Sequence, residues 1–148
     1  MIDEVTVNSS LAMVEKSYVN DLNAGTLAFY TSMKGNTDEE KAKLFNAMNN
    51  PDHRISDMIG KTITVKDVFV EEVEMVNEET GEIVKAPRIV VIDTKGESYQ
   101  AVSVGVMSAF KKLFQLFGAP TWEKGIPLEV RQLKKGKNNI LTFAIPTK

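Results

Sequence analysis

An amphipathic helix with a defined start and a defined end, lying between stretches of strand-like sequence, constrains the fold of this chain more than any other feature. Ser103 can accept a backbone N–H bond at the start of the helix, and Gly118 can take the left-handed conformation that ends it. The apolar side chains between them recur at spacings of three or four and share one helical face. They are Val106, Met107, Phe110, Leu113, Phe114 and Phe117. The helix must therefore pack along one side on a core that is otherwise made of strands.

Five strands are predicted around this helix, because apolar residues alternate with period two on both sides of it. In the first strand the phase of the alternation shifts, which predicts a bend or bulge near Lys66 and another near Glu71. Pro87 predicts a bulge or an edge position in the second strand. The predicted strands cover residues 59–75, 83–92, 97–102, 126–133 and 140–145, with turns at 77–81, 93–96 and 136–139.

The resulting order is three strands, one helix and two further strands, with a first strand that bends. This is the order of the OB-fold, a five-stranded Greek-key β-barrel in which the helix lies between strands 3 and 4. A ferredoxin-like sheet is the main alternative, but it needs a helix directly after the first strand, where the sequence offers none. We therefore predict a mainly β fold, with an OB-fold nucleic-acid-binding domain over residues 56–148.

The first 55 residues are predicted to be an extension outside the sheet. Thr37 and Glu40 have the spacing of a capping box and an apolar stripe follows them, so a helix is expected at about residues 38–49. Residues 1–36 are weakly patterned, although Leu11, Val14 and Tyr18 could share a helical face. Two interpretations of the extension stay open. It packs against its own domain, or it docks as an arm on a neighbouring subunit and supports a homo-oligomer or a cooperative assembly.

The composition favours a single soluble domain over a membrane or disordered protein. A length of 148 residues and an apolar content of 43 % suit one domain with a substantial core. The chain has no apolar run long enough to span a bilayer, and Asp3 and Glu4 stand where a signal peptide would be basic. Cysteine is absent, which excludes disulfides and thiolate chemistry. We expect a cytoplasmic protein with no membrane partner.

The net charge of −2 conceals two segments of opposite sign. Between Asp67 and Lys85, seven acidic residues stand against Lys85 as the one base. After Val102, eight basic residues outnumber Glu123 and Glu129. The chain can therefore form a basic surface although its total charge is slightly negative.

No set of residues in the sequence suits catalysis or a cofactor. His53 is the single histidine and has no cysteine or second histidine with which to hold a metal, so it is expected on the surface. No glycine-rich phosphate loop and no Ser/His/Asp set can be assembled. Glu71, Glu72 and Glu74 alternate along a strand and indicate a solvated hairpin edge. We predict a non-enzymatic binding protein without a cofactor or a metal.

A barrel that binds single-stranded nucleic acid needs cations for the phosphate backbone and aromatic faces for the bases. The candidate aromatic residues are Phe69, Tyr99 and Trp122, and the candidate cations are Lys66, Arg88, Lys95, Lys134, Lys135 and Lys137. Phe69 is expected to point outward if its neighbours in the first strand point inward. Each candidate also has a structural alternative. The rings could belong to the core, Trp122 could cap the end of the barrel, and the three hairpin lysines could form a solvated turn.

Between about Asn49 and Ile145 the chain resembles the small single-stranded DNA-binding proteins encoded by phages and conjugative plasmids of Gram-positive bacteria. The segments that carry this resemblance are Asn50-Pro51, Ile59-Gly60-Lys61, Ala86-Pro87-Arg88-Ile89-Val90, Gly96-Glu97-Ser98-Tyr99-Gln100-Ala101-Val102-Ser103, Phe117-Gly118-Ala119-Pro120-Thr121-Trp122 and the closing basic hairpin. The resemblance implies an OB-fold that coats single-stranded DNA during replication or transfer with little sequence preference. The chain departs from the chromosomal bacterial type, because it ends Ile145-Pro146-Thr147-Lys148 and not in an acidic tail, so recruitment of other enzymes through such a tail is not expected.

Two other functions stay open on the sequence alone. One is a protein-interaction barrel whose extension and acidic first hairpin contact a partner without any nucleic acid. The other is RNA binding, because a stacking platform accepts either sugar.

Overall fold

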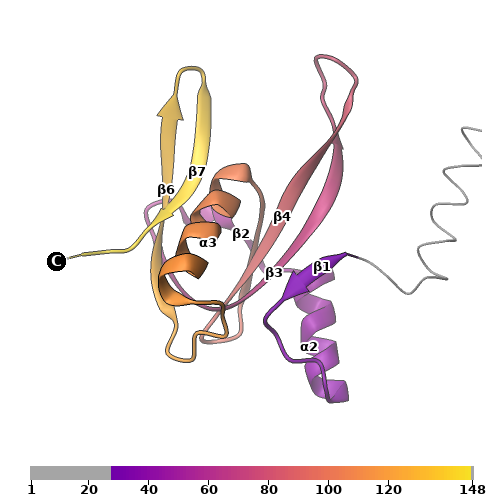
Figure 1. Cartoon of the computed structure of the whole chain (residues 1–148), viewed down its shortest axis with the longest axis vertical. Coiled ribbons are helices and arrows are strands. Elements are labelled where there is room, and N and C mark those ends of the chain that lie inside the picture. Colours follow the sequence, from indigo (N-terminus) through magenta and orange to yellow (C-terminus); the bar gives the residue numbers. More distant parts are fainter. Residues whose placement is uncertain (1–27, 148) are drawn as a thin grey trace, which may run out of the picture.

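The computed structural model describes residues 28–147, which form a mainly β fold with two helices in that range. Figure 1 shows two long hairpins standing on either side of a helix. The elements are β1 (Phe29–Thr31), α2 (Asp38–Asn49), β2 (His53–Arg54), the 3-10 turn η1 (Ile55–Met58), β3 (Thr62–Val76), β4 (Ile83–Asp93), β5 (Ser98–Val102), α3 (Val104–Phe117), β6 (Ile126–Lys135) and β7 (Asn138–Ala144). The helical stripe considered at Leu11, Val14 and Tyr18 lies outside the described residues. Neither helix within residues 28–147 is long and apolar enough to cross a lipid bilayer.

The strands form one curled, open sheet in the order β2-β5-β4-β3-β6-β7. β1 pairs with residues 69–71 of β3, on the edge opposite to β4. The first part of β3 pairs with β6 and the rest pairs with β4, so one long strand connects both parts of the sheet. The register with β4 shifts between Val65 and Asp67, which confirms the irregularity predicted near Lys66. The second irregularity, predicted near Glu71, is wrong because the pairing with β4 continues there in regular register.

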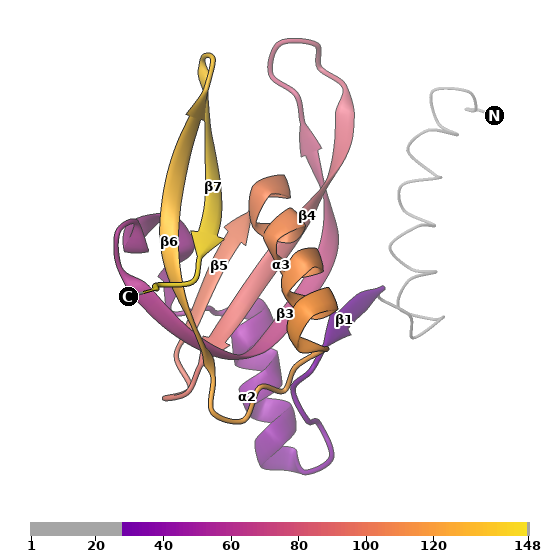
Figure 2. The same ribbon diagram turned by 60° about the vertical axis from the view of Figure 1, so that its left-hand side comes forward.

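α3 has the start and the end that its sequence predicts. The Ser103 hydroxyl oxygen accepts the Val106 N–H at 3.0 Å, and Gly118 ends the helix with a φ of 79°. Gly105 lets the helix approach β7, because a Cβ there would collide with the carbonyl oxygen of Leu141. Val106, Phe110 and other residues of the predicted stripe pack on the inner face of the sheet and form the main core with β3, β4 and β6. Figures 1 and 2 show α3 between the two hairpins.

A second, smaller core lies on the opposite face of the sheet. Successive residues of β4 alternate between the two cores, since Ile89 and Val91 belong to the main one while Val90 and Ile92 contact the second. Ala47 of α2 covers this second face. The helix begins with the predicted capping box, in which the Thr37 side chain accepts the Glu40 N–H and the Glu40 carboxylate accepts the Thr37 N–H. The sheet is therefore covered by α3 on one face and by α2 on the other.

The prediction that the first 55 residues lie outside the sheet is wrong for two short strands. β1 pairs antiparallel with β3, and β2 pairs parallel with β5. The side chains of these strands reveal no period because the strands have only three and two residues. The five predicted strands correspond to β3, β4, β5, β6 and β7.

Candidate nucleic-acid interface

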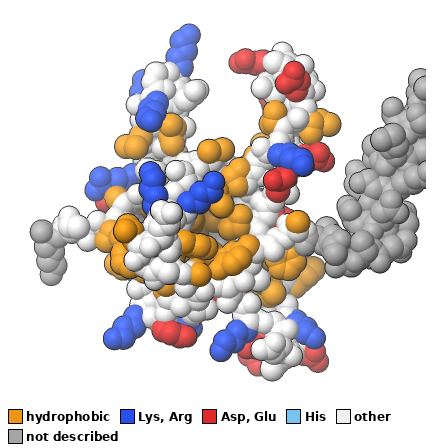
Figure 3. Space-filling model, in the orientation of Figure 1, with side chains coloured by type: hydrophobic (Ala, Val, Ile, Leu, Met, Phe, Trp, Pro, Cys, Tyr) orange, Lys and Arg blue, Asp and Glu red, His pale blue; other side chains and the backbone are white. Residues whose placement is uncertain are grey.

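Two hairpins extend beyond the body of the sheet as two-stranded ribbons (Figure 1). β4 pairs with β5 only from Arg88 onward, so residues 72–87 of β3 and β4 stand apart, and we call them the acidic arm. β6 pairs with β3 as far as Glu129, and Val130 still bonds to Gly60 and Lys61, so residues 131–142 of β6 and β7 form a second ribbon, the basic arm. Figure 3 shows acidic side chains at the tip of one arm, basic side chains at the tip of the other, and hydrophobic and basic side chains between them.

The predicted lysines Lys134, Lys135 and Lys137 all lie at the exposed tip of the basic arm. They surround Gly136, whose φ of 61° permits the tight turn. Lys134 and Lys135 are neighbours in a strand, so their side chains leave opposite faces of the ribbon. Lys135 lines a groove of about 300 Å³ between the basic arm and α3, together with Lys112. One of the three lysines thus faces the surface between the arms.

The prediction that the Phe69 ring points outward is wrong. Its side chain is 0 % exposed, because α2 and β1 cover the face of the sheet on which it lies. Arg88 lies beside it with the guanidinium carbon 6.0 Å from the ring centroid. The Arg88 side chain is only 14 % exposed and donates to Glu71 at 2.8 Å and to Gln100 at 3.1 Å. These contacts occupy Arg88 within the fold.

Tyr99 and Trp122 are core residues in this structure. The Trp122 indole packs against the rings of Phe110 and Phe114 and donates its N–H to the Gly118 carbonyl at 3.1 Å. The Tyr99 hydroxyl donates to Asp93 Oδ2 at 3.0 Å. Burial raises the pKa of the Tyr99 phenol to about 12, and its hydrogen bond to the Asp93 carboxylate adds to the shift. Neither ring has a free face for a base.

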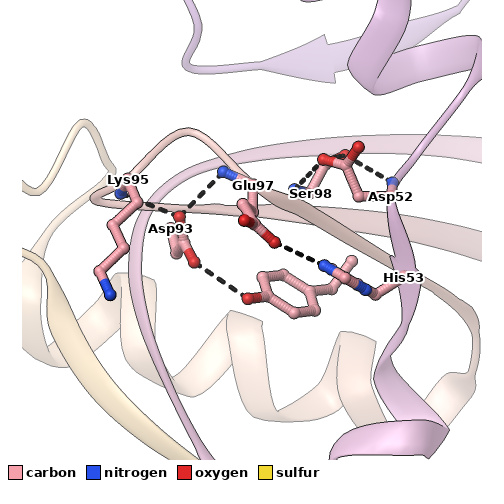
Figure 4. A network of polar contacts seen from close by, with 7 residues as sticks. Asp52, His53, Asp93, Lys95, Glu97 and Ser98 are labelled. Atoms are coloured by element: carbon pink, nitrogen blue, oxygen red, sulfur yellow. Dashed lines mark hydrogen bonds and ion pairs between the residues drawn. The ribbon is translucent and has the colours of Figure 1, made fainter.

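A polar network around the β4–β5 turn holds β2 against β5. Figure 4 shows Asp52 directed at Ser98 and His53 directed at Glu97. The Ser98 backbone N–H donates to Asp52 Oδ2 at 3.0 Å, and His53 Nε2 lies 2.5 Å from Glu97 Oε1. The His53 ring also stacks on Tyr99 with ring centroids 4.9 Å apart. His53 is half-exposed, as expected of a surface residue, and its partners in the structure are architectural.

Lys66 and Lys95 come together near this turn and line a cavity of about 550 Å³. Three carboxylates line the same cavity, from Asp52, Asp67 and Asp93. The cavity is therefore mixed in charge. The predicted site residues divide into separate groups: Lys66 and Lys95 here, Phe69 and Arg88 under α2, Tyr99 and Trp122 in the core, and Lys134, Lys135 and Lys137 on the basic arm.

Two aromatic residues that were not among the predicted nucleic-acid-binding residues are exposed beside the acidic arm. Phe29 is 44 % exposed and Tyr30 is 41 % exposed, on the two faces of β1. The Phe29 ring packs on Phe69 with centroids 5.4 Å apart, and the Tyr30 ring packs on Phe114 at 5.8 Å. Both line a groove of about 640 Å³ between β1, the base of the acidic arm and α3. They lie in a segment without a periodic pattern, so the sequence does not indicate that their side chains are exposed.

The exposed side of α3 connects this groove to the one beside the basic arm. Lys111 lines the first groove and Lys112, the next residue, lines the second. Lys85 adds a cation to the first groove, where it also pairs with Glu72 at 3.4 Å. We call the resulting surface the inter-arm face. It consists of Tyr30, Lys85, Lys111, Lys112 and Lys135, with Phe29 at its border, because the Phe29 ring packs on Phe69 on the α2 side of the sheet.

Exposed rings beside a row of lysines are the features that single-strand-binding proteins use, because rings stack on bases and cations follow the phosphates. A curled β-sheet that carries such a face belongs to the single-strand-binding class of β proteins. The model of the phage single-stranded DNA-binding protein family matches residues 23–146, so the chain belongs to that family. The match confirms the resemblance to phage proteins and begins earlier than residue 49. Comparisons with curated proteins and with solved structures gave no match.

Proposed function

We propose that this protein is a non-enzymatic, cytoplasmic protein that coats single-stranded DNA with little sequence preference during phage replication or plasmid transfer. Membership of the phage single-stranded DNA-binding family supports DNA as the partner. The observation that carries the choice of surface is the exposure of Phe29 and Tyr30 in a groove that also holds Lys85 and Lys111.

We also propose that the curled sheet is an OB-type Greek-key barrel that is open between β5 and β7. The order β5-β4-β3-β6-β7 is the strand order 3-2-1-4-5 of such a barrel, and α3 follows the third strand in the chain. In OB-folds the hairpins between strands 1 and 2 and between strands 4 and 5 border the nucleic-acid site. Here those hairpins are the acidic arm and the basic arm. The inter-arm face lies between them.

The inter-arm face suits a single strand better than a duplex. A stacked base contributes roughly 1–3 kcal/mol when its face meets an aromatic ring, and every base has such a face. In a duplex these faces are hidden by stacking on neighbouring base pairs. Lys111, Lys112 and Lys135 contact phosphates in this proposal, and such contacts do not distinguish sequences. Little sequence preference follows from both contributions.

Fluorescence anisotropy with a labelled oligo-dT, a matched duplex and an oligo-rU of equal length tests this function. We expect saturable binding to oligo-dT at low salt and weaker binding to the duplex. Equal affinity for the duplex would show that phosphate contacts alone hold the DNA. No saturable binding to oligo-dT would refute the proposal, and tighter binding to oligo-rU would make RNA the partner.

A further inference from the structure

The acidic arm carries exposed apolar residues that a solvated hairpin does not need. At its outer end Val76 is 64 % exposed and Ile83 is 66 % exposed, and they are paired across the two strands. Clustered exposed apolar side chains on a small domain mark contact surfaces. Five carboxylates and one base surround them, and the base, Lys85, pairs with Glu72. These residues are Glu72, Glu74, Glu78, Glu79, Glu82 and Lys85.

The basic arm has the complementary properties. No acidic residue occurs between Val130 and Thr147, and Lys134 and Lys137 project from the tip. Leu133 is half-exposed, but it lines the groove beside α3 together with Lys135, so it lies on the face of the ribbon opposite to Lys134. β7 is an edge strand of the sheet, so its outer backbone groups are open to another strand. Each arm thus offers one sign of charge, and the acidic arm adds exposed apolar surface.

The two arms of one chain do not neutralise each other. They stand apart in both views (Figures 1 and 2), and among residues 28–147 no ion pair joins them. Each arm keeps its charge for a partner outside the chain. The acidic arm of another copy carries the charge that complements the charge of the basic arm.

We propose that the tip of the acidic arm of one copy docks on the tip of the basic arm of the next copy along the DNA. Glu78 and Glu79 of the first copy then pair with Lys134 and Lys137 of the second. This contact joins two different surfaces, so it can repeat from copy to copy, and in this proposal it extends as an open chain along the DNA. Lys135 lies on the other face of the basic arm and stays with the DNA. The inference rests on the proposed function, because the chain of copies forms on a long single strand.

Charge reversal tests the contact directly. One variant carries Glu78→Lys and Glu79→Lys, and a second carries Lys134→Glu and Lys137→Glu. Each alone places like charges on both arms of every copy, so we expect cooperativity on long oligo-dT to fall by about tenfold at low salt. Raising the salt should reduce the difference from wild type, because exposed charges are screened. A matched control for the first variant carries Asp57→Lys and Glu123→Lys, two exposed positions outside the arms, with the same change in net charge.

An equal mixture of the two reversed variants restores opposite charges wherever the two variants alternate along the DNA, and like-charged neighbours are disfavoured, so we expect the mixture to recover much of the cooperativity that each variant loses. Affinity of the first variant for a short oligonucleotide that holds one copy should match that of the control. If the mixture stays as weak as the separate variants, the arm-to-arm contact is wrong. If the short oligonucleotide loses binding in the second variant as much as the long one does, Lys134 and Lys137 contact DNA and the docking proposal is refuted while DNA binding stands.

Discussion

The burial of Phe69 gives a prediction that separates a core ring from a DNA-stacking ring. Phe69 is 0 % exposed and packs between Val90, Ile92 and the ring of Phe29. Truncating a buried phenylalanine costs about 3–5 kcal/mol, from lost burial and from the cavity that remains. Phe69→Ala should therefore lower the free energy of unfolding by about that amount. Phe69→Leu keeps most of the volume and should cost under about 1.5 kcal/mol.

Phe45→Ala is the matched control, because Phe45 lies on α2 with 59 % of its surface exposed. This exposed substitution should change stability by no more than about 0.5 kcal/mol. Urea unfolding followed by far-UV circular dichroism measures all three variants. Once folded, the Phe69→Leu protein should bind oligo-dT as wild type does. A Phe69→Ala protein as stable as Phe45→Ala, with weaker DNA binding, would refute the reasoning.

Three further predictions follow from the structure. The pKa of Tyr99 is about 12 in the fold, against an ordinary value near 10, so the free energy of unfolding should fall as the pH rises from about 10 to about 12. Unfolding experiments across that range should show no such loss for Tyr99→Phe. Changing Lys111, Lys112 and Lys135 to alanine should flatten the slope of log affinity against log salt by roughly 2 units, at about 0.7 per phosphate contact, and an unchanged slope would remove these lysines from the interface. If the extension docks on a neighbouring copy, deleting residues 1–27, which leaves β1 in place, should reduce cooperativity on long DNA more than affinity for a short oligonucleotide. Unchanged cooperativity after the deletion would contradict that role.

The sequence predicts the elements that have a long period or a defined cap. The α3 stripe from Val106 to Phe114, the caps at Ser103 and Thr37 and the phase shift at Lys66 appear in the structure where the pattern places them, whereas Phe117 at the end of the stripe is 51 % exposed. These features are local, so the residues next to one another in the chain are sufficient to determine them. β1 and β2 are too short to show a period, and their pairing depends on strands far away in the sequence.

The candidate site was harder to predict because exposure is a tertiary property. Parity along β3 correctly separates Phe69 from Val68, but it cannot reveal that α2 covers the face on which Phe69 lies. Parity also cannot reveal that Arg88 pairs with Glu71 within the fold. Phe29 and Tyr30 became visible only when β1 placed them at the edge of the sheet. Lys135 was predicted from local turn chemistry, and it alone of the nine predicted residues lines the inter-arm face.

The measurement that tests the central claim most directly compares oligo-dT binding by the double variant Phe29→Ala/Tyr30→Ala with binding by wild type and by Phe45→Ala. The Phe29 and Tyr30 rings also pack on Phe69 and Phe114, so the double variant should lose some stability, and binding is compared under conditions where all three proteins are folded. If the inter-arm face stacks on bases, the double variant should lose roughly 1–3 kcal/mol for each ring that stacks, which is about 5-fold to 150-fold per ring. Phe45→Ala should bind as wild type does. Wild-type affinity in the double variant, with its fold intact by circular dichroism, would contradict the claim that DNA lies between the arms.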